Sequence, residues 1–186
     1  MRIVILGAGN WLLSDEGFGV HAVKYLAENY EFPDELEIFD AGTLGLSGAY
    51  ALESADAVYV LDTVNAKGRP GEIKLYNKDD VMMPDRITAK LSPHQLGIRE
   101  MLLVTQLRGK LPAELVLFGV IPASLEPGIE LSPAVKMAVR TIARMLISDI
   151  LSRGLSVRSK VVAPAAFPDL SSFLGTKEGQ NEDAWI

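Results

Sequence analysis

Short apolar segments near the start of the chain alternate with stretches of helical periodicity, and this alternation limits the possible folds more than any other feature. Residues 2–6, 36–39 and 57–61 are mostly apolar, as strands in the interior of a sheet are. Between them, residues 15–30 repeat apolar side chains at helical spacing, and a short helix is expected over residues 45–54. This order is typical of parallel sheets with right-handed crossovers.

The second half of the chain adds further strands and helices. Residues 115–120 form another buried apolar run, and residues 72–76 alternate in polarity with a period of two, as an edge strand does. An amphipathic helix is expected to begin at Ser92 or Pro93. The predicted fold class is α/β, with three layers: a twisted, mostly parallel sheet of about five strands, flanked by helices on both faces.

The last clear helix marks the end of the predicted domain. Ser132 suits the helix N-cap, Pro133 the first helical position, and Gly154 the C-terminal stop. We therefore expect a single domain over residues 1–154. Residues 155–186 show no sustained periodicity, and we expect them to form an irregular or disordered tail.

Composition excludes several function classes. A net charge of −6 argues against a broad electrostatic contact with nucleic acid. The chain contains no cysteine, which excludes disulfides, thiolate metal sites and a cysteine nucleophile. No segment is uncharged over the roughly 18 residues that a membrane span requires. We expect a cytoplasmic monomer that does not insert into a membrane.

A tight turn at residues 7–10 follows the first strand and precedes a helix. Gly and Asn tolerate the backbone angles of such a turn. We expect the helix to begin near Ser14, as N-cap, with Asp15 and Glu16 at the positive end of its dipole. Glu16 then lies beyond the carboxyl end of the first strand, where ligands bind in open α/β sheets, although helix capping alone would also explain its position.

Further acids follow the next two strands. Asp40 ends one and Asp62 the other, so both are expected to lie near Glu16, because the carboxyl ends of parallel strands share one edge of the sheet. His94 is expected in the first turn of its helix, at the same edge. Carboxylates and one imidazole suit a divalent ion such as nickel or zinc with open coordination positions, but unrelated surface acids and a histidine would give the same spacing. His21 lies off the apolar stripe of its helix and is expected to be a solvated surface residue.

Two other enzyme classes differ in their support from the sequence: a dinucleotide-dependent oxidoreductase has partial support, and a hydrolase with a serine nucleophile has little. The turn at Gly7 and Gly9, with Asp40 at the end of the second strand, resembles a dinucleotide-binding fingerprint, but Leu12 stands in place of the third glycine. A dinucleotide-dependent oxidoreductase therefore stays an alternative. No Gly-x-Ser-x-Gly nucleophile motif occurs.

Several longer motifs surround the candidate residues. They are Gly7-Ala-Gly-Asn-Trp-Leu-Leu-Ser-Asp-Glu-Gly-Phe-Gly-Val20, Asp40-Ala-Gly-Thr43, Leu61-Asp62, Ser92-Pro-His-Gln95, Gly119-Val-Ile-Pro122 and Ser124-Leu-Glu-Pro127. Together these motifs resemble the hydrogenase maturation proteases, which trim the large subunit of nickel–iron hydrogenases. The resemblance covers roughly residues 1–153.

The resemblance implies an activity and a set of site residues. The activity is that of an aspartyl-type endopeptidase that removes the C-terminal extension of the large-subunit precursor, just after its nickel-binding motif. The implied nickel ligands are Glu16, Asp62 and His94, and the nickel is supplied by the substrate rather than stored. Glu16 and Asp62 are the implied catalytic carboxylates, and Asp40 would line the same cleft and assist cleavage. Ala41 replaces a glycine of the family motif.

A non-cleaving protein of the same ancestry would retain the same three ligands. Such a protein would bind nickel or the precursor as a chaperone of hydrogenase assembly. The sequence does not separate this alternative from the protease.

Overall fold

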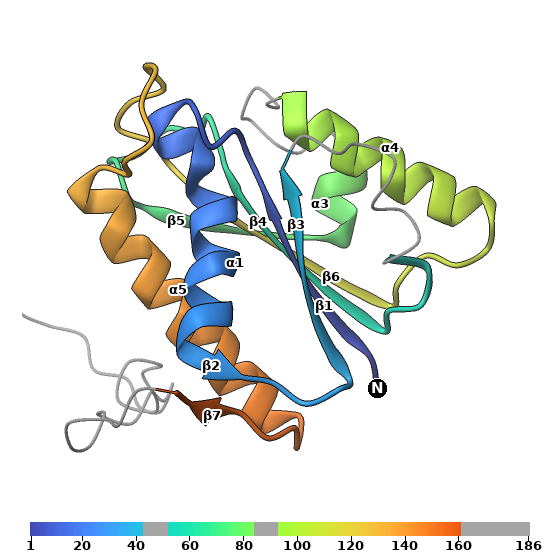
Figure 1. Ribbon diagram of the computed structural model, residues 1–186. Helices are drawn as coiled ribbons and strands as arrows, with labels where there is room; N and C mark the ends of the chain where they lie inside the picture. Colours follow the sequence, from blue (N-terminus) through green and yellow to red (C-terminus); the bar gives the residue numbers. More distant parts are fainter. Residues whose placement is uncertain (43–51, 84–92, 161–186) are drawn as a thin grey trace, which may run out of the picture.

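The computed structural model describes residues 1–42, 52–83 and 93–160, in which strands and helices alternate through most of the chain (Figure 1). The strands are β1 (Ile3–Ala8), β2 (Tyr30–Glu31), β3 (Leu36–Gly42), β4 (Ala57–Thr63), β5 (Ile73–Asn77), β6 (Glu114–Val120) and β7 (Arg158–Ser159). The helices are the 3-10 helix η1 (Ser14–Gly17) and the α-helices α1 (Phe18–Asn29), α3 (Lys78–Met82), α4 (Pro93–Leu107) and α5 (Pro133–Ser152).

A five-stranded sheet in the order β3-β1-β4-β6-β5 forms the middle layer. β1 pairs in parallel with β3 and β4, and β4 with β6, whereas β5 runs antiparallel to β6 at one edge. The predicted sheet is thus confirmed, including the edge strand expected over residues 72–76. All residues of β1 are buried, because this strand lies inside the sheet with helices on both of its faces.

Helices cover both faces of the sheet and form the two outer layers (Figure 1). On one face, α1 and α5 pack with Ile3 and Ile5 in the larger hydrophobic cluster. On the other, α3 and α4 pack with Val4 and Leu6. Because side chains alternate along a strand, neighbouring positions of one strand belong to different cores. The position of a residue along its strand therefore fixes the face of the sheet on which its side chain lies.

Glycines allow α1 to cross the sheet at very short range. A Cβ atom at Gly7 would lie 2.3 Å from the carbonyl oxygen of Gly19, and one at Gly19 would lie 2.1 Å from the carbonyl oxygen of Leu61. No side chain fits between backbones at these distances. The glycines therefore set the start of α1, and η1 directly before it, against the ends of β1 and β4.

The start of the first helical region differs from the prediction. Its first turn is the 3-10 helix η1, and Ser14 is the first residue of η1 rather than its N-cap, which is Leu13 and makes no side-chain capping hydrogen bond. Ser14 instead has a positive φ of 48°, and its hydroxyl donates to the carbonyl oxygen of Glu126 at 2.8 Å. A contact with a distant loop thus replaces the local cap.

The two ends of α5 are as predicted. Ser132 caps α5 by accepting from the backbone N–H of Val135 at 3.4 Å, Pro133 is the first helical residue, and Gly154 follows the helix with a φ of 82°. The residues after Gly154, however, are not all irregular. β7 pairs with β2 in an antiparallel ribbon, because the chain turns back along the end of α1 after α5.

Some predictions fall outside the described residues. Most of the helix expected over 45–54, the Ser92 start of α4 and residues 161–186 belong to this group. In the described part of the chain, no helix is sufficiently long and apolar to cross a membrane.

Candidate active site

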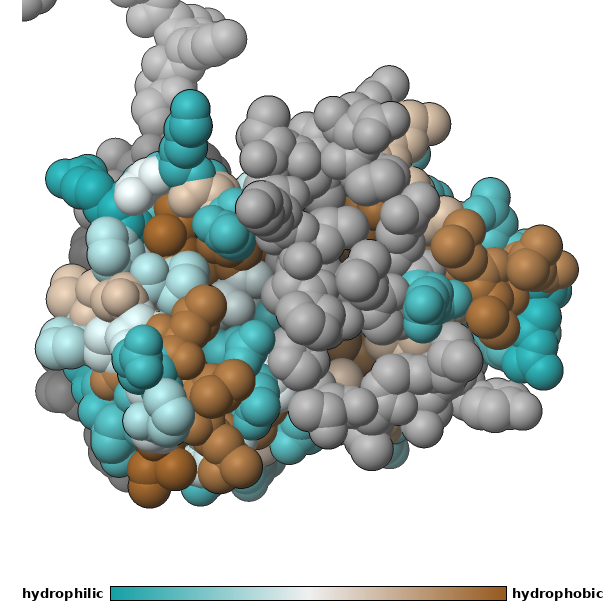
Figure 2. Space-filling view, turned by 90° about the horizontal axis from the view of Figure 1, so that it is seen from above, coloured by the Kyte–Doolittle hydropathy of each residue, from teal (hydrophilic) through white to brown (hydrophobic). Residues whose placement is uncertain are grey.

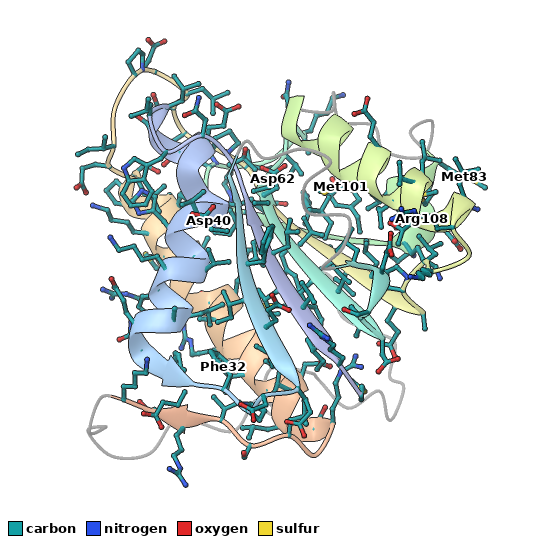
Figure 3. The ribbon with its side chains drawn as sticks, turned by 45° about the vertical axis from the view of Figure 1, so that its right-hand side comes forward. Phe32, Asp40, Asp62, Met83, Met101 and Arg108 are labelled. Carbon is teal, nitrogen blue, oxygen red and sulfur yellow. The ribbon has the colours of Figure 1, made fainter. Side chains whose placement is uncertain are left out.

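The carboxyl ends of the parallel strands lie at the upper edge of the sheet in Figure 1. The starts of the first helical region and of α4 lie at the same end of the molecule. This is the edge at which ligands bind in open α/β sheets. Figure 3 shows Asp62 at this edge, at the end of β4. The acids that the sequence singled out come from η1, β3 and β4.

Asp62 is a fully buried carboxylate, with 0% of its surface exposed. Its Oδ1 accepts a hydrogen bond from the backbone N–H of Thr63 at 2.7 Å. On β4 it lies opposite Gly119 of β6. A buried charge is costly unless it is hydrogen-bonded or binds a cation. A buried aspartate at the end of a strand therefore indicates a functional group rather than an ordinary surface acid.

Glu16 lies on η1, which contacts the end of β4. Its backbone is packed against the turn after β1: a Cβ at Gly9 would lie 1.9 Å from the carbonyl oxygen of Glu16, and Gly9 has a φ of 135°. The backbone N–H of Glu16 donates to the carbonyl oxygen of Leu13 at 3.0 Å. The two glycine-dependent contacts, here and at the start of α1, hold Glu16 beside the strand that carries Asp62.

Asp15, next in the chain to Glu16, has a structural role that sequence reasoning missed. It is 0% exposed. Its Oδ2 accepts the backbone N–H groups of Ala123 and Ser124 at 2.8 and 3.2 Å, and its Oδ1 accepts that of Ser132 at 2.6 Å. Hydrogen bonds from backbone N–H groups to a carboxylate are stronger than those between neutral groups, so Asp15 ties η1 to the segment between β6 and α5. Nothing in the local sequence distinguishes this buried acceptor from an acid at a helix start.

The loop between β6 and α5 is joined to the η1 region by further backbone contacts. The backbone N–H of Ser14 donates to the carbonyl oxygen of Gly128 at 2.7 Å, and the backbone N–H of Gly128 donates to the carbonyl oxygen of Leu12 at 2.9 Å. Leu12, Leu125 and Ile129 remain exposed on these segments. Seen from above, apolar side chains gather on the side of the molecule with α1 and α5 and again over α4 (Figure 2).

The structure does not bring the side chains of Asp40 and Asp62 together. Ile38 packs with the core beneath α1 and α5, so Asp40, two residues further along β3, lies on the same face. Val60 packs with the core beneath α3 and α4, so Asp62 lies on the opposite face from Asp40. Figure 3 shows Asp40 on the side of β3 that faces α1. The expected convergence is therefore limited to the edge of the sheet.

His94 lies in the first turn of α4, as predicted. Its side chain is outside the described residues, so the ligand set of Glu16, Asp62 and His94 stays a prediction. Within the described part of the chain, no group of three His, Asp or Glu side chains is arranged to hold a metal ion.

His21 differs from the prediction of a solvated residue. Its ring stacks on Trp11, with centroids 4.0 Å apart and an interplanar angle of 10°, and its Nε2 lies 3.1 Å from the carbonyl oxygen of Ile129. Burial lowers the pKa of His21, partly offset by the Ile129 carbonyl and by Glu130. Trp11 of the turn supplies the partner, which helical periodicity alone does not show.

Comparison with known proteins agrees with this architecture. The family model for hydrogenase maturation proteases matches residues 20–149. The hydrogenase 2 maturation protease of Escherichia coli K12 is 37% identical over 156 residues, which is 83% of this chain and 94% of that protein. The hydrogenase expression/formation protein HupD of Bradyrhizobium diazoefficiens is 38% identical over 168 residues, 89% of this chain and 85% of that protein.

Solved structures give the same result. The hydrogenase maturating endopeptidase HybD from E. coli matches with a TM-score of 0.79 at 36% identity, over 86% of this chain and 98% of that chain. The [NiFe] hydrogenase maturation protease HybD from Thermococcus kodakarensis matches with a TM-score of 0.67 at 26% identity, over 78% of this chain and 97% of that chain. These matches define the class as an α/β endopeptidase. The chain belongs to the hydrogenase maturation protease family, and this assignment replaces the oxidoreductase alternative.

Proposed function

We propose that this endopeptidase removes the C-terminal extension of a nickel-loaded precursor of the large subunit of a nickel–iron hydrogenase. Glu16, Asp62 and His94 contact the nickel of the substrate, which the protein does not store. The observation that carries the proposal is the fully buried Asp62 at the end of β4, with Glu16 on the adjoining η1, in a chain of this family. The proposed partner is the precursor, and the protein acts as a monomer in the cytoplasm.

The donor set supports this role chemically. Carboxylate and imidazole groups suit a borderline divalent ion, and three protein ligands leave positions for substrate groups and water. Nickel in such a site lowers the pKa of a bound water or polarises the scissile carbonyl. A carboxylate accepts the proton of the attacking water and then returns it to the leaving amine as the peptide bond breaks. The chain has no cysteine, so a thioester intermediate on this protein is excluded.

Cleavage of the cognate precursor tests the proposal directly. Nickel-loaded precursor is incubated with the protein, and the products are weighed by mass spectrometry. We expect loss of a single C-terminal peptide, dependent on nickel in the precursor. Asp62→Asn and His94→Ala should lose this activity, whereas Asp34→Asn, a change of the same kind at an exposed loop residue, should retain it.

The two proposed roles of the site give different results in this assay. Nickel-dependent binding of the precursor without release of a peptide would contradict the protease and favour the non-cleaving chaperone. Cleavage that is equally fast with nickel-free precursor would contradict recognition through nickel.

A further inference from the structure

A groove on the α1 face of the sheet lies beside the candidate site and is not explained by it. Its volume is about 490 Å³. It opens between α1 and β3, and most of its lining is apolar. The lining includes Trp11, Val23, Lys24, Ala27, Ile38 and Asp40.

The strand that borders this groove has an unpaired outer side in the described sheet. β3 is the outermost strand, with β1 as its neighbour on the other side. Ile3 lies opposite Leu36, and the N–H of Ile3 donates to the carbonyl oxygen of Glu35 at 2.8 Å. In a parallel pair, this register turns the backbone groups of alternate residues away from β1. Ile38 and Asp40 are the residues of this outward-facing set that also line the groove.

Because an open strand edge and a groove lie side by side, an extended peptide is the ligand that fits this surface. A strand added to β3 would form backbone hydrogen bonds at Ile38 and Asp40. Its side chains would alternate between the faces of the sheet, so every second one would enter the groove. The apolar lining suits an apolar side chain there.

The charges on the two rims of the groove have opposite signs. Lys24 projects from α1, with its ammonium 5.2 Å from the centre of the Trp11 ring, and Asp40 projects from β3 toward α1 (Figure 3). A peptide with an acidic side chain near Lys24 and a basic one near Asp40 would match both rims. The Trp11 end of the groove belongs to the turn that leads into η1 and Glu16.

From these features, we infer that the groove between α1 and β3 binds the C-terminal extension of the precursor as an added strand. This inference rests on the proposed function. The nickel-binding part of the precursor occupies the Glu16 and Asp62 side, so the chain beyond the scissile bond is what remains to fill the groove. β3 and β4 both adjoin β1 and lie about 10 Å apart, a distance that about three extended residues span.

A substitution that fills the groove tests the inference with a matched control on the same helix. Ala27 and Glu28 are both exposed on α1, and only Ala27 lines the groove. Ala27→Trp should raise KM for the nickel-loaded precursor at least about tenfold with kcat unchanged, and should weaken binding of a synthetic extension peptide to the same degree. Glu28→Trp should change neither, and both variants should keep the Tm of the wild type.

Backbone methylation of the extension peptide tests strand addition itself. We expect N-methylation at alternate residues to abolish binding and N-methylation at the residues between them to leave it intact, because only one set of N–H groups faces β3. Equal effects at all positions, or equal binding to the Ala27→Trp and Glu28→Trp variants, would overturn the inference. A lower KM for Ala27→Trp would also overturn it.

The peptide measurements separate this inference from the proposed function. If the wild type cleaves the precursor and Ala27→Trp cleaves it with an unchanged KM, the protease stands and the groove assignment fails. If the wild type does not cleave but binds the extension peptide with the expected methylation pattern, the groove assignment stands and the protease fails.

Discussion

Asp40 and Asp62 look equivalent in the sequence but lie in different surroundings. Each ends a parallel strand at the same edge of one sheet. Asp62 is fully buried on the α3 and α4 face, whereas Asp40 is exposed on the α1 face, beside a groove. A position at a strand end therefore does not by itself fix the surroundings of an acid. Under the proposed function, the Asp62 face of the edge is the reaction side and the Asp40 face is the binding side.

The largest expected effect comes from Asp62. Asp62→Asn keeps the size of the side chain but removes its charge, and the loss of a ligand to a divalent ion costs several kcal/mol of transition-state stabilisation. We expect precursor cleavage to fall by at least about 10³-fold, measured in single-turnover reactions. The Tm should stay close to that of the wild type. Cleavage within tenfold of the wild-type rate would remove Asp62 from the reaction side.

Asp15 should dominate stability in the same region without contacting the substrate. Asp15→Ala leaves the backbone N–H groups of Ala123, Ser124 and Ser132 without their acceptor. Hydrogen bonds to a charged group contribute about 1.5–3 kcal/mol each, so the free energy of unfolding should fall by about 3 kcal/mol or more. Urea denaturation measures this change. Asp34→Ala, at an exposed position, should stay within about 0.5 kcal/mol of the wild type.

The division between the faces predicts a third, smaller effect at Asp40. Asp40→Asn should raise KM for the precursor by about three- to fivefold, because an exposed ion pair contributes about 1 kcal/mol or less. The value of kcat should change by less than about twofold. Steady-state cleavage measures both constants. A loss of kcat comparable to that of Asp62→Asn would show that Asp40 acts in catalysis, as the family resemblance implies, and would contradict the division between the two faces.

The sequence predicted the sheet well because its signals are local. The apolar strands, the alternating polarity of β5 and the punctuation of α5 by Ser132, Pro133 and Gly154 are each encoded within a few residues. Glu16 and Asp62 were placed at the correct edge for the same reason. What the sequence did not reveal depends on distant partners: Asp15 bonds to a loop that lies more than a hundred residues away, and the face of Asp40 follows from the packing of Ile38.

The 3-10 start of the first helical region has the same kind of cause. Ser14 bonds to Glu126, and the neighbouring backbone pairs with Gly128, so the loop after β6 determines where α1 begins. The prediction of a local N-cap could not include this loop. β7 was missed because a pair of residues is too short to show a strand pattern, and it is formed only by contact with β2.

The smallest effect concerns His21, which lies on the binding side between Trp11 and Ile129. Burial lowers its pKa from the usual value of 6.5, and nearby Lys24 and Lys136 lower it further, against the opposing effect of Glu130. The folded protein therefore binds fewer protons at this residue than the unfolded chain does just below pH 6.5. Stability that is present above this pH should be lost as the pH falls through the lowered folded pKa.

His21→Gln, which has no titrating group, should make the Tm less sensitive to pH between about 7.5 and 5.5. If the wild type and the variant lose Tm in parallel over this range, His21 is not held neutral by its stack on Trp11.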